Sequence, residues 1–307
     1  MSVVGAVAGA GLDRLFGEPP ARFHPVARYG SMMEAVERRT YDDRRLAGLT
    51  HLMVGVTASV AVGLGLRRLL GRHGSTALAT WACVAATMLD DEASSIALML
   101  QAGDLDGARL RVRSLVGRSA EQLDVSEISR AVIESVAENC VDAVTASLFW
   151  ATVGGAPAVL AHRAINTLDA MVGHRNERYE RFGWATARLD DVVNYIPARL
   201  TAAAVVAARP ASARSVVRTV RRDAPQHPSP NGGVVEAAFA AALAVRLGGV
   251  NTYDGHVEDR GILGDGRAVQ VTDIDAAVRL RRNSTVVVIV LLVTADRLRR
   301  QVVRRRR

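Results

Sequence analysis

Long apolar stretches separated by short polar interruptions run along most of this chain, and their length is typical of helices rather than of strands. Residues 49–66 are nearly uncharged and approach the roughly 20 apolar residues that cross a membrane. Shorter or interrupted apolar stretches follow at residues 76–88, 143–161, 192–208 and 284–295. We therefore predict an all-α, multi-pass integral membrane protein.

Two of these stretches contain residues that interrupt helices. Residues 154–157 read Gly-Gly-Ala-Pro, and Pro197 lies inside the stretch 192–208. Interrupted helices are tolerated at membrane depth where they line a cavity. The pattern thus predicts broken helices around a polar cavity. Re-entrant helices, or the core of a soluble helical protein, remain alternative explanations of the same breaks.

The remaining segments are more polar, and we predict a single helical membrane domain over residues 1–307. Within it, residues 101–133 form a polar helical segment with a helix start near Ser126, and residues 209–233 form a Pro/Arg-rich connector. A helix is expected at 234–247, ending at Gly248-Gly249, followed by a loop over 251–275. The sequence contains neither an internal repeat nor a continuous β pattern.

Composition supports helices and a membrane partner. Hydrophobic residues make up 49% of the chain but aromatic residues only 4%, which favours Ala/Val/Leu-rich helices over a β sandwich. The net charge is +8, and an arginine run at 297–307 follows an apolar stretch. Arginines beside an apolar segment favour membrane lipid over nucleic acid as the partner. Residues 2–12 look like a retained apolar segment rather than a cleaved signal peptide.

The two cysteines carry no metal-ligand spacing. Cys83 and Cys140 lie far apart, each in an apolar stretch. We expect two buried thiols and no disulfide.

Three carboxylates interrupt the apolar sequence at helical spacing. Glu134, Glu138 and Asp142 are separated by four residues each, so we expect them on one face of a helix, with Asn139 beside them. Like charges so placed repel unless a cation neutralises them, and hard oxygen ligands suit Mg²⁺. A solvated acidic face is the alternative, but ionisable groups between apolar segments favour a functional site.

Two further polar patches follow along the chain. We expect His162, Asn166 and Asp169 on one helical face with Arg163 beside it, and Asp190 and Asp191 precede Asn194 and Arg199. A second acidic cluster could complete a metal–phosphate site. One of the two adjacent aspartates could instead cap the next helix.

Residues 229–233 read Ser-Pro-Asn-Gly-Gly before a predicted helix. Backbone N–H groups around Ser229, Asn231 and Gly232 would then point at an anion such as phosphate. A simple helix cap by Ser229 or Asn231 is the alternative. The segment is not a Walker A motif, because it lacks the Gly-Lys-Ser/Thr ending.

Taken together, these motifs resemble the CobD/CbiB family of cobalamin biosynthesis over nearly the whole chain. The resemblance is carried by segments in one order, at 13–26 (D-x-x-x-G-E-P-x-x-x-x-H-P-V, which includes His24), 116–118 (V-G-R), 134–142 (E-S-V-A-E-N-x-V-D), 163–173 (R-A-x-N-T-L-D-x-M-V-G), 182–199 (F-G-x-x-x-A-R-L-D-D-V-x-N-x-I-P-A-R), 229–233 (S-P-N-G-G) and 247–249 (L-G-G), with Tyr253. Members are multi-pass membrane proteins, which agrees with the apolar pattern.

The resemblance implies an adenosylcobinamide-phosphate synthase, an ATP-dependent ligase. It would join the free carboxylate of adenosylcobyric acid to (R)-1-aminopropan-2-ol or to its O-phosphate, with ATP and Mg²⁺. The corrinoid and the amine would be its partners, and ATP use favours a cytoplasm-facing site in the cell membrane. Whether the chain forms a homo-oligomer stays open.

The chemistry of that reaction then distributes roles among the polar residues. We hypothesise metal ligands and bases at Glu134, Glu138 and Asp142, with Asp190 or Asp191. We expect three arginines to hold phosphate or carboxylate groups of the substrates, namely Arg118, Arg163 and Arg199. The amide groups of the corrinoid would form hydrogen bonds with four asparagines, Asn139, Asn166, Asn194 and Asn231. All three polar patches would converge on one site.

Other functional classes are compatible with parts of the pattern. The family has relatives resembling AmpE, a non-catalytic membrane signalling protein, but that reading predicts loss of the acidic clusters and of residues 229–233. A transporter also uses broken helices, yet it would be expected to show related halves. A soluble nucleic-acid binder fits the charge alone.

Overall fold

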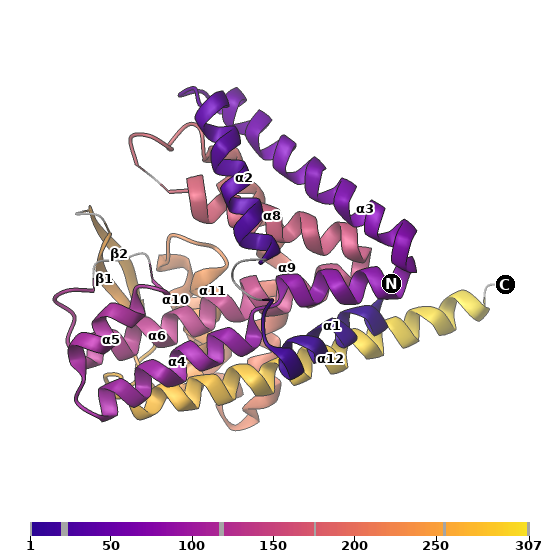
Figure 1. Ribbon diagram of the computed structural model, residues 1–307. Helices are drawn as coiled ribbons and strands as arrows, with labels where there is room; N and C mark the ends of the chain where they lie inside the picture. Colours follow the sequence, from indigo (N-terminus) through magenta and orange to yellow (C-terminus); the bar gives the residue numbers. More distant parts are fainter. Residues whose placement is uncertain (1, 20–23, 117–119, 175, 254–255, 306–307) are drawn as a thin grey trace. The chain divides into compact units, whose positions relative to one another are not determined.

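The computed structural model describes residues 2–19, 24–116, 120–174, 176–253 and 256–305, except for the side chains of 251–258 and 305 (Figure 1). Its elements are the helices α1 (Val3–Phe16), α2 (Pro25–Thr40), α3 (Arg45–Cys83), α4 (Ala86–Gln101), α5 (Leu105–Val112), α6 (Val125–Asn139), α7 (Ala146–Gly154), α8 (Ala156–Val172), α9 (Trp184–Ala208), α10 (Ala213–Asp223), α11 (Gly232–Leu243) and α12 (Thr272–Arg305), the short helical turns η2 (Cys140–Thr145), η3 (Pro210–Ser212) and η4 (Ala224–Gln226), and the strands β1 (Leu247–Tyr253) and β2 (His256–Leu263). The predicted all-α class is confirmed in a coarser form, because the described residues are nearly all helical but include the strands β1 and β2.

The chain forms two compact units whose segments interleave along the sequence. Unit 1 comprises residues 1–87, 142–194 and 289–307, and unit 2 comprises residues 88–141 and 195–288. Helices α9 and α12 each contribute residues to both units.

Unit 1 is built around the long helix α3, which lies along α8 and α1. A close approach fixes the α3–α8 contact, because a Cβ on Gly63 would lie 2.5 Å from the Cα of Pro157. Nearby, Met33 of α2, Leu52 of α3 and Leu168 of α8 pack into one buried cluster. Apolar burial between helices therefore organises this unit.

The predicted break in the stretch 143–161 is confirmed. Gly155 ends α7 with a φ of 72°, a backbone conformation that favours glycine, and α8 begins at the next residue with Pro157 in its first turn. Pro197, in contrast, lies inside an unbroken α9. The expected interruption at that proline was wrong.

Unit 2 has the larger buried core. Its centre consists of apolar residues of α6 and α11, among them Ile128, Val132 and Phe239. Helix α6 starts at a capping box in which Asp124 and Glu127 each bond the other's backbone N–H. The helix start therefore lies at Asp124, two residues before the Ser126 predicted from the sequence.

The stretch 251–275 was predicted as a loop, but its first part is a β-hairpin. Strands β1 and β2 pair antiparallel, with Leu247 opposite Leu263 and an irregularity between Gly248 and Val250. Both leucines are buried. The signal was missed because several glycines interrupt the alternation that predicts strands. Gly248 has a φ of 75°, which other residues rarely adopt.

Two other boundaries differ from the predictions. The connector 209–233 contains a well-formed helix, α10, between two short turns. Helix α11 ends at Leu243 rather than 247, because Ala244 adopts a left-handed conformation with a φ of 56°. The two cysteines are buried thiols, as predicted.

Among the described residues, one helical stretch, Arg45–Gln101, is long and apolar enough to cross a membrane, although residues 84–85 interrupt it. It comprises α3, which has a non-helical residue at Gly71, and α4. Large apolar side chains of α3, including Met53 and Val62, are exposed on this stretch. The multi-pass arrangement stays a prediction.

Candidate functional site

Unit 2 buries a group of charged side chains beside the second half of α6. Glu134 is 3% exposed, and its Oε1 accepts hydrogen bonds from the Gly248 N–H at 2.8 Å and from Arg130 at 3.3 Å. Arg130 also donates to the Gly248 carbonyl oxygen. Glu134 therefore anchors the start of the hairpin to α6.

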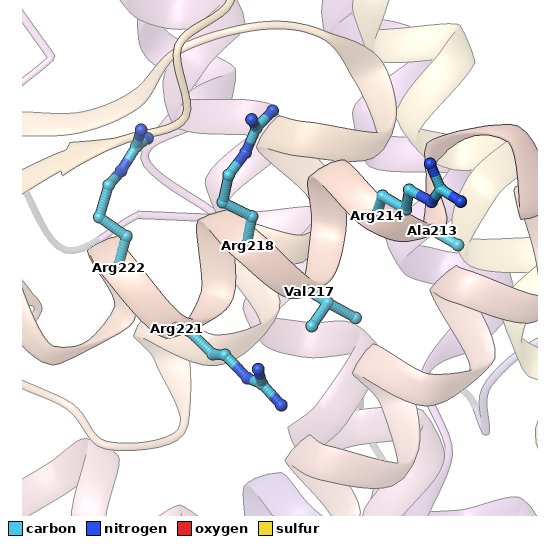
Figure 2. Close-up of a pocket in the computed structure, with 6 residues that line it drawn as sticks. All are labelled: Ala213, Arg214, Val217, Arg218, Arg221 and Arg222. Atoms are coloured by element: carbon cyan, nitrogen blue, oxygen red, sulfur yellow. The ribbon is translucent and has the colours of Figure 1, made fainter.

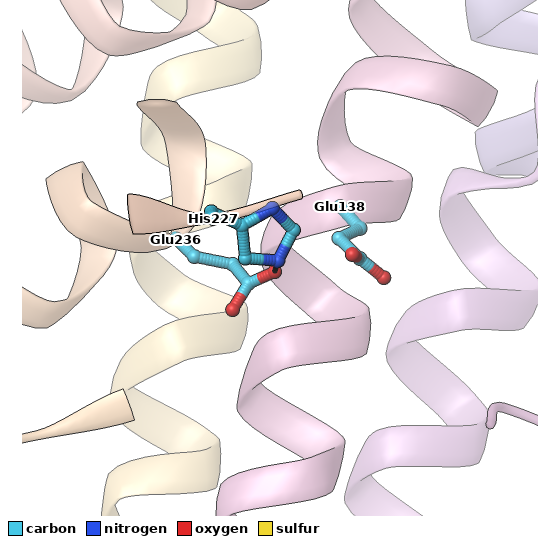
Figure 3. A group of neighbouring side chains, drawn as sticks. All are labelled: Glu138, His227 and Glu236. Carbon is cyan, nitrogen blue, oxygen red and sulfur yellow. Dashed lines mark ion pairs between the residues drawn. The ribbon is translucent and has the colours of Figure 1, made fainter. Parts of the chain in front are cut away.

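Glu138, one helical turn further along α6, belongs to a cluster with His227 and Glu236 (Figure 3). One ligand atom from each of these residues lies within 4.8 Å of the others. His227 Nε2 lies 3.2 Å from Glu236 Oε1, and Arg260 Nη1 donates to Glu138 Oε1 at 3.2 Å. The cluster thus joins α6, the loop before α11 and α11 itself.

The Ser-Pro-Asn-Gly-Gly segment shapes this cluster. A Cβ on Gly232 would lie 3.0 Å from His227 Cε1 and 3.3 Å from Glu138 Oε1. A Cβ on Gly233 would lie 2.6 Å from His227 Cβ and from the Ala224 carbonyl oxygen. Both glycines are therefore needed for α11 to start this close to the histidine.

Glu236 is the most deeply buried member of the cluster. Its side chain is 0% exposed, and neither carboxylate oxygen has a hydrogen bond to a described residue. Desolvation by burial, reinforced by the charges of Glu138 and Glu134, raises its pKa well above the ordinary value, while Arg260 opposes that shift. Such a carboxyl group can hold either a proton or a cation.

Among the described residues, this is the one group of three side chains whose spacing could hold a metal ion. It differs from the predicted set Glu134, Glu138 and Asp142. Helix α6 continues into η2, a π-helix whose wider turns change the face on which Asp142 lies. Glu138 is common to both sets, while His227 and Glu236 were missed.

Unit 1 brings a second set of predicted residues together. Asn166 of α8 donates to Asp142 at 3.1 Å and to Asp190 at 3.4 Å. Asn194 donates to Asp190 at 3.0 Å, and its side-chain oxygen lies 2.8 Å from His162 Nε2. The predicted patches on η2, α8 and α9 therefore form one hydrogen-bonded network.

Burial sets the protonation of this network. It lowers the pKa of His162 to about 4, so the ring is neutral at pH 7 and its Nε2–H donates to Asn194. Burial raises the pKa of Asp190 to about 6. It also raises that of Asp169 to about 7, with further contributions from Asp190 and Asp191. The network is thus suited to holding and releasing protons near neutral pH.

The Asp169 shift predicts a stability that falls as pH rises. Between its ordinary pKa near 4 and its folded pKa of about 7, the folded state binds a proton that the unfolded state has lost. We expect Asp169→Asn to remove part of the decline in melting temperature between pH 5 and pH 8. Differential scanning fluorimetry in detergent would measure this slope.

The exposed Asp106 supplies the control for that experiment. Asp106→Asn should leave the pH slope of the melting temperature at its wild-type value. An Asp169→Asn protein with a wild-type slope would contradict the assigned pKa.

Asp190 and Asp191 do not cap a helix. Both lie inside α9, which begins at Trp184, so the capping alternative was wrong. Ser229, in contrast, does act at a helix start, since its Oγ accepts from the Gly232 N–H at 3.1 Å and from the Asn231 N–H at 3.3 Å. That contact favours the cap over a phosphate site.

The predicted arginine clamps fall in different surroundings. Arg199 bonds to the side chain of Asn231 at 2.6 Å and to the Pro230 carbonyl oxygen at 3.0 Å, so it positions the segment before α11. Arg163 lines a cavity of about 300 Å³ in unit 1, together with Arg28 and Thr167. Arg118 lies outside the described residues.

Asn139 and His24, which the sequence analysis also named, make local contacts. Asn139 donates back to its own helix, to the Ser135 carbonyl oxygen at 3.0 Å. His24 contacts Glu18 at 3.3 Å near the start of α2.

Sequence reasoning also missed a row of arginines on α10. Arg214, Arg218 and Arg222 recur every four residues, so they lie along one side of the helix, with Arg221 apart from them (Figure 2). Arg222 pairs with Asp223 and Asp265. The other three side chains line an open groove that can attract anions.

Comparison with known proteins identifies relatives along nearly the full chain. The model of the family described as CobD/Cbib protein matches residues 6–281. The "Cobalamin biosynthesis protein CobD" of Mycobacterium tuberculosis is 49% identical over 285 residues, which cover 91% of each chain. The proteins of that name from Pelobacter propionicus and Halalkalibacterium halodurans are 42% and 40% identical, covering 83% and 92% of this chain and 82% and 93% of their own.

No solved structure matches the chain. The family model spans the residues that form the two clusters, from Glu138 to Glu236. With this coverage and identity, the chain belongs to the CobD/Cbib protein family.

Proposed function

We propose that this chain acts in cobalamin biosynthesis as an ATP-dependent amide ligase. It joins the free carboxylate of adenosylcobyric acid to (R)-1-aminopropan-2-ol or its O-phosphate, and the product is adenosylcobinamide or its phosphate. Family membership over residues 6–281 supports the pathway. The single observation that carries the chemistry is the Glu138–His227–Glu236 cluster, which offers a base and a cation site together.

The reaction needs an activated carboxylate. A carboxylate oxygen is a poor leaving group, so ATP converts the acid into an acyl phosphate with release of ADP, or into an adenylate with release of pyrophosphate. The amine nitrogen then attacks the acyl carbon and forms the amide bond. Phosphate or AMP leaves with the bonding electrons, and the nitrogen loses one proton to a base.

Glu138 is best placed to accept that proton. Its side chain is 35% exposed, whereas Glu236 and His227 are nearly inaccessible behind it. Arg260 donates a hydrogen bond to Glu138 Oε1 at 3.2 Å and so orients the carboxylate. Glu138 would therefore contact the amine, whereas His227 and Glu236 are buried further inside the protein.

Magnesium fits as the ion that accompanies ATP. It would neutralise charge on the phosphate oxygens during activation. The guanidinium groups of Arg214, Arg218 and Arg221 on α10 would attract anionic parts of the substrates.

The membrane location is part of this proposal. Exposed apolar side chains on α3, such as Met53 and Val62, would be covered by lipid. The arginine-rich end of α12 and the use of ATP favour a cytoplasmic site. If the protein is released from membranes by alkaline washing without detergent, the membrane assignment is wrong.

Mass spectrometry of the product tests the reaction. Purified full-length protein would be incubated with adenosylcobyric acid, ATP–Mg²⁺ and each amine in turn. We expect a product whose mass equals acid plus amine minus water, formed only with ATP. Absence of product with both amines would reject the ligase and favour a non-catalytic membrane protein.

A further inference from the structure

We propose that Glu138, His227 and Glu236 hold a resident divalent transition metal, separate from the Mg²⁺ that accompanies ATP. The inference rests on the geometry of unit 2 alone. It shares Glu138 with the proposed ligase reaction, but metal binding is measured without turnover, so a failure of one is distinguishable from a failure of the other.

The spacing of the three side chains suits one cation. Nitrogen and carboxylate oxygen ligands lie about 2.0–2.2 Å from such a metal, so two of them at a tetrahedral angle are about 3.4 Å apart. His227 Nε2 and Glu236 Oε1 are 3.2 Å apart, and a Glu138 oxygen completes a group within 4.8 Å. Only small side-chain rotations are required to close the site.

The histidine is held in an orientation suited to a ligand. His227 Nδ1 accepts a hydrogen bond from the Ser229 N–H at 3.0 Å and lies 3.2 Å from the Ser229 carbonyl oxygen, and these contacts fix the ring. Its Nε2 then carries the ring proton and faces Glu236 Oε1 at 3.2 Å, the position at which a metal ion would replace that proton. With a metal on Nε2 the proton would lie on Nδ1, where the Ser229 carbonyl oxygen can accept it, a common support for metal-binding histidines.

The burial of Glu236 points to the same cation. Its side chain is 0% exposed, with no hydrogen bond to either oxygen from a described residue. The nearest guanidinium nitrogen, Nη1 of Arg260, is 3.8 Å away and bonds to Glu138 instead. A buried carboxylate whose charged or polar neighbours are His227 at 3.2 Å and Arg260 at 3.8 Å gains further stability when it coordinates a metal.

The donor set favours a transition metal over magnesium. Imidazole nitrogen suits Zn²⁺ and Fe²⁺, carboxylates also suit Mn²⁺, and Mg²⁺ takes oxygen ligands and keeps several waters. The cluster supplies one nitrogen and two carboxylates in a buried setting. We expect affinity to follow Zn²⁺ > Mn²⁺, with Mg²⁺ much weaker.

Arg260 provides an internal test, because its guanidinium group lies beside the carboxylates of Glu138 and Glu236 that would bind the metal. Its Nη1 bonds to Glu138 Oε1 and lies 3.8 Å from Glu236 Oε1. A positive charge at that distance repels an incoming cation. Arg260→Met should therefore tighten metal binding, on the order of tenfold, which a misfolded variant could not do.

The experiment uses full-length protein in detergent, stripped with EDTA. Mn²⁺ binding is followed by electron paramagnetic resonance, and Zn²⁺ and Mg²⁺ are added as competitors. We expect one Mn²⁺ per chain, displaced by Zn²⁺ but not by equal Mg²⁺. His227→Asn and Glu236→Gln should each weaken binding more than about 100-fold, since even supporting residues of metal sites contribute 10–100-fold.

Glu121→Gln is the matched control, because Glu121 is an exposed carboxylate of the same unit. It should bind Mn²⁺ like the wild type. Binding that survives His227→Asn, displacement by equal Mg²⁺, or no stoichiometric binding by wild-type protein would each overturn the proposal. Since none of these readouts requires turnover, a failure of the ligase assay leaves their interpretation unchanged.

Discussion

Replacing Glu138 by glutamine is expected to lower the rate of amide formation by about 10²–10⁴-fold, the usual contribution of a positioned general base. The variant Glu138→Gln keeps the size of the side chain but removes its charge and basicity. Glu138 is the accessible member of its cluster, with 35% of its side chain exposed, so the reacting amine can reach it. Initial rates in detergent at saturating ATP–Mg²⁺ would measure the loss.

Glu121→Gln serves as the control, since its exposed carboxylate pairs with Arg113 on the surface. Its rate should stay within about twofold of the wild type, as expected for an exposed ion pair. A further readout separates the base from a merely structural role: the loss at Glu138 should shrink as pH rises and free amine becomes abundant. Full activity of Glu138→Gln at pH 7 would exclude Glu138 from the chemistry.

The four-residue spacing of polar residues predicted Glu138 as a site residue, because the sequence shows which residues share one face of the same helix. His227 and Glu236 could not be paired with it in that way. They lie about 90 residues later, and spacing within one helix says nothing about which other helix packs against it. A local signal existed in residues 227–236, where a histidine, two glycines and a glutamate stand together.

Asp142 shows a second limit of sequence reasoning. Four-residue spacing predicts a common face only while the backbone remains α-helical, and a π-helix begins at Cys140. Asp142 accordingly bonds to Asn166 in unit 1, whereas Glu134 and Glu138 bond within unit 2. The convergence of all three polar patches on one site stays a prediction.

Breaks caused by backbone geometry were easier to predict than sheets. The turn at Gly155 follows from adjacent glycines and a proline, which act locally. The β1–β2 hairpin depends on cross-strand pairing and on glycines such as Gly248, whose positive φ resembles a loop signal. Local rules therefore recovered the break at Gly155, but they predicted a break at Pro197 that α9 does not have, and they missed the hairpin.

Asp90 lies just after the apolar stretch 76–88 and forms a buried ion pair in unit 2. Arg281 donates to its two oxygens at 2.7 Å and 2.6 Å, and Arg282 donates at 2.7 Å. Asp90 is 5% exposed and Arg281 is 4% exposed. The pair joins α4 to α12 across 191 positions of sequence.

Asp90→Ala should lower the free energy of unfolding by about 3–5 kcal/mol, because Arg281 would remain buried without its counter-charge. The midpoint of denaturant unfolding in detergent would measure this, with Asp106→Ala as the exposed control at under about 1 kcal/mol. The double variant Asp90→Ala with Arg281→Met should recover much of the loss, since it removes the uncompensated charge itself. If the double variant is less stable than Asp90→Ala alone, packing rather than an unpaired charge accounts for the effect.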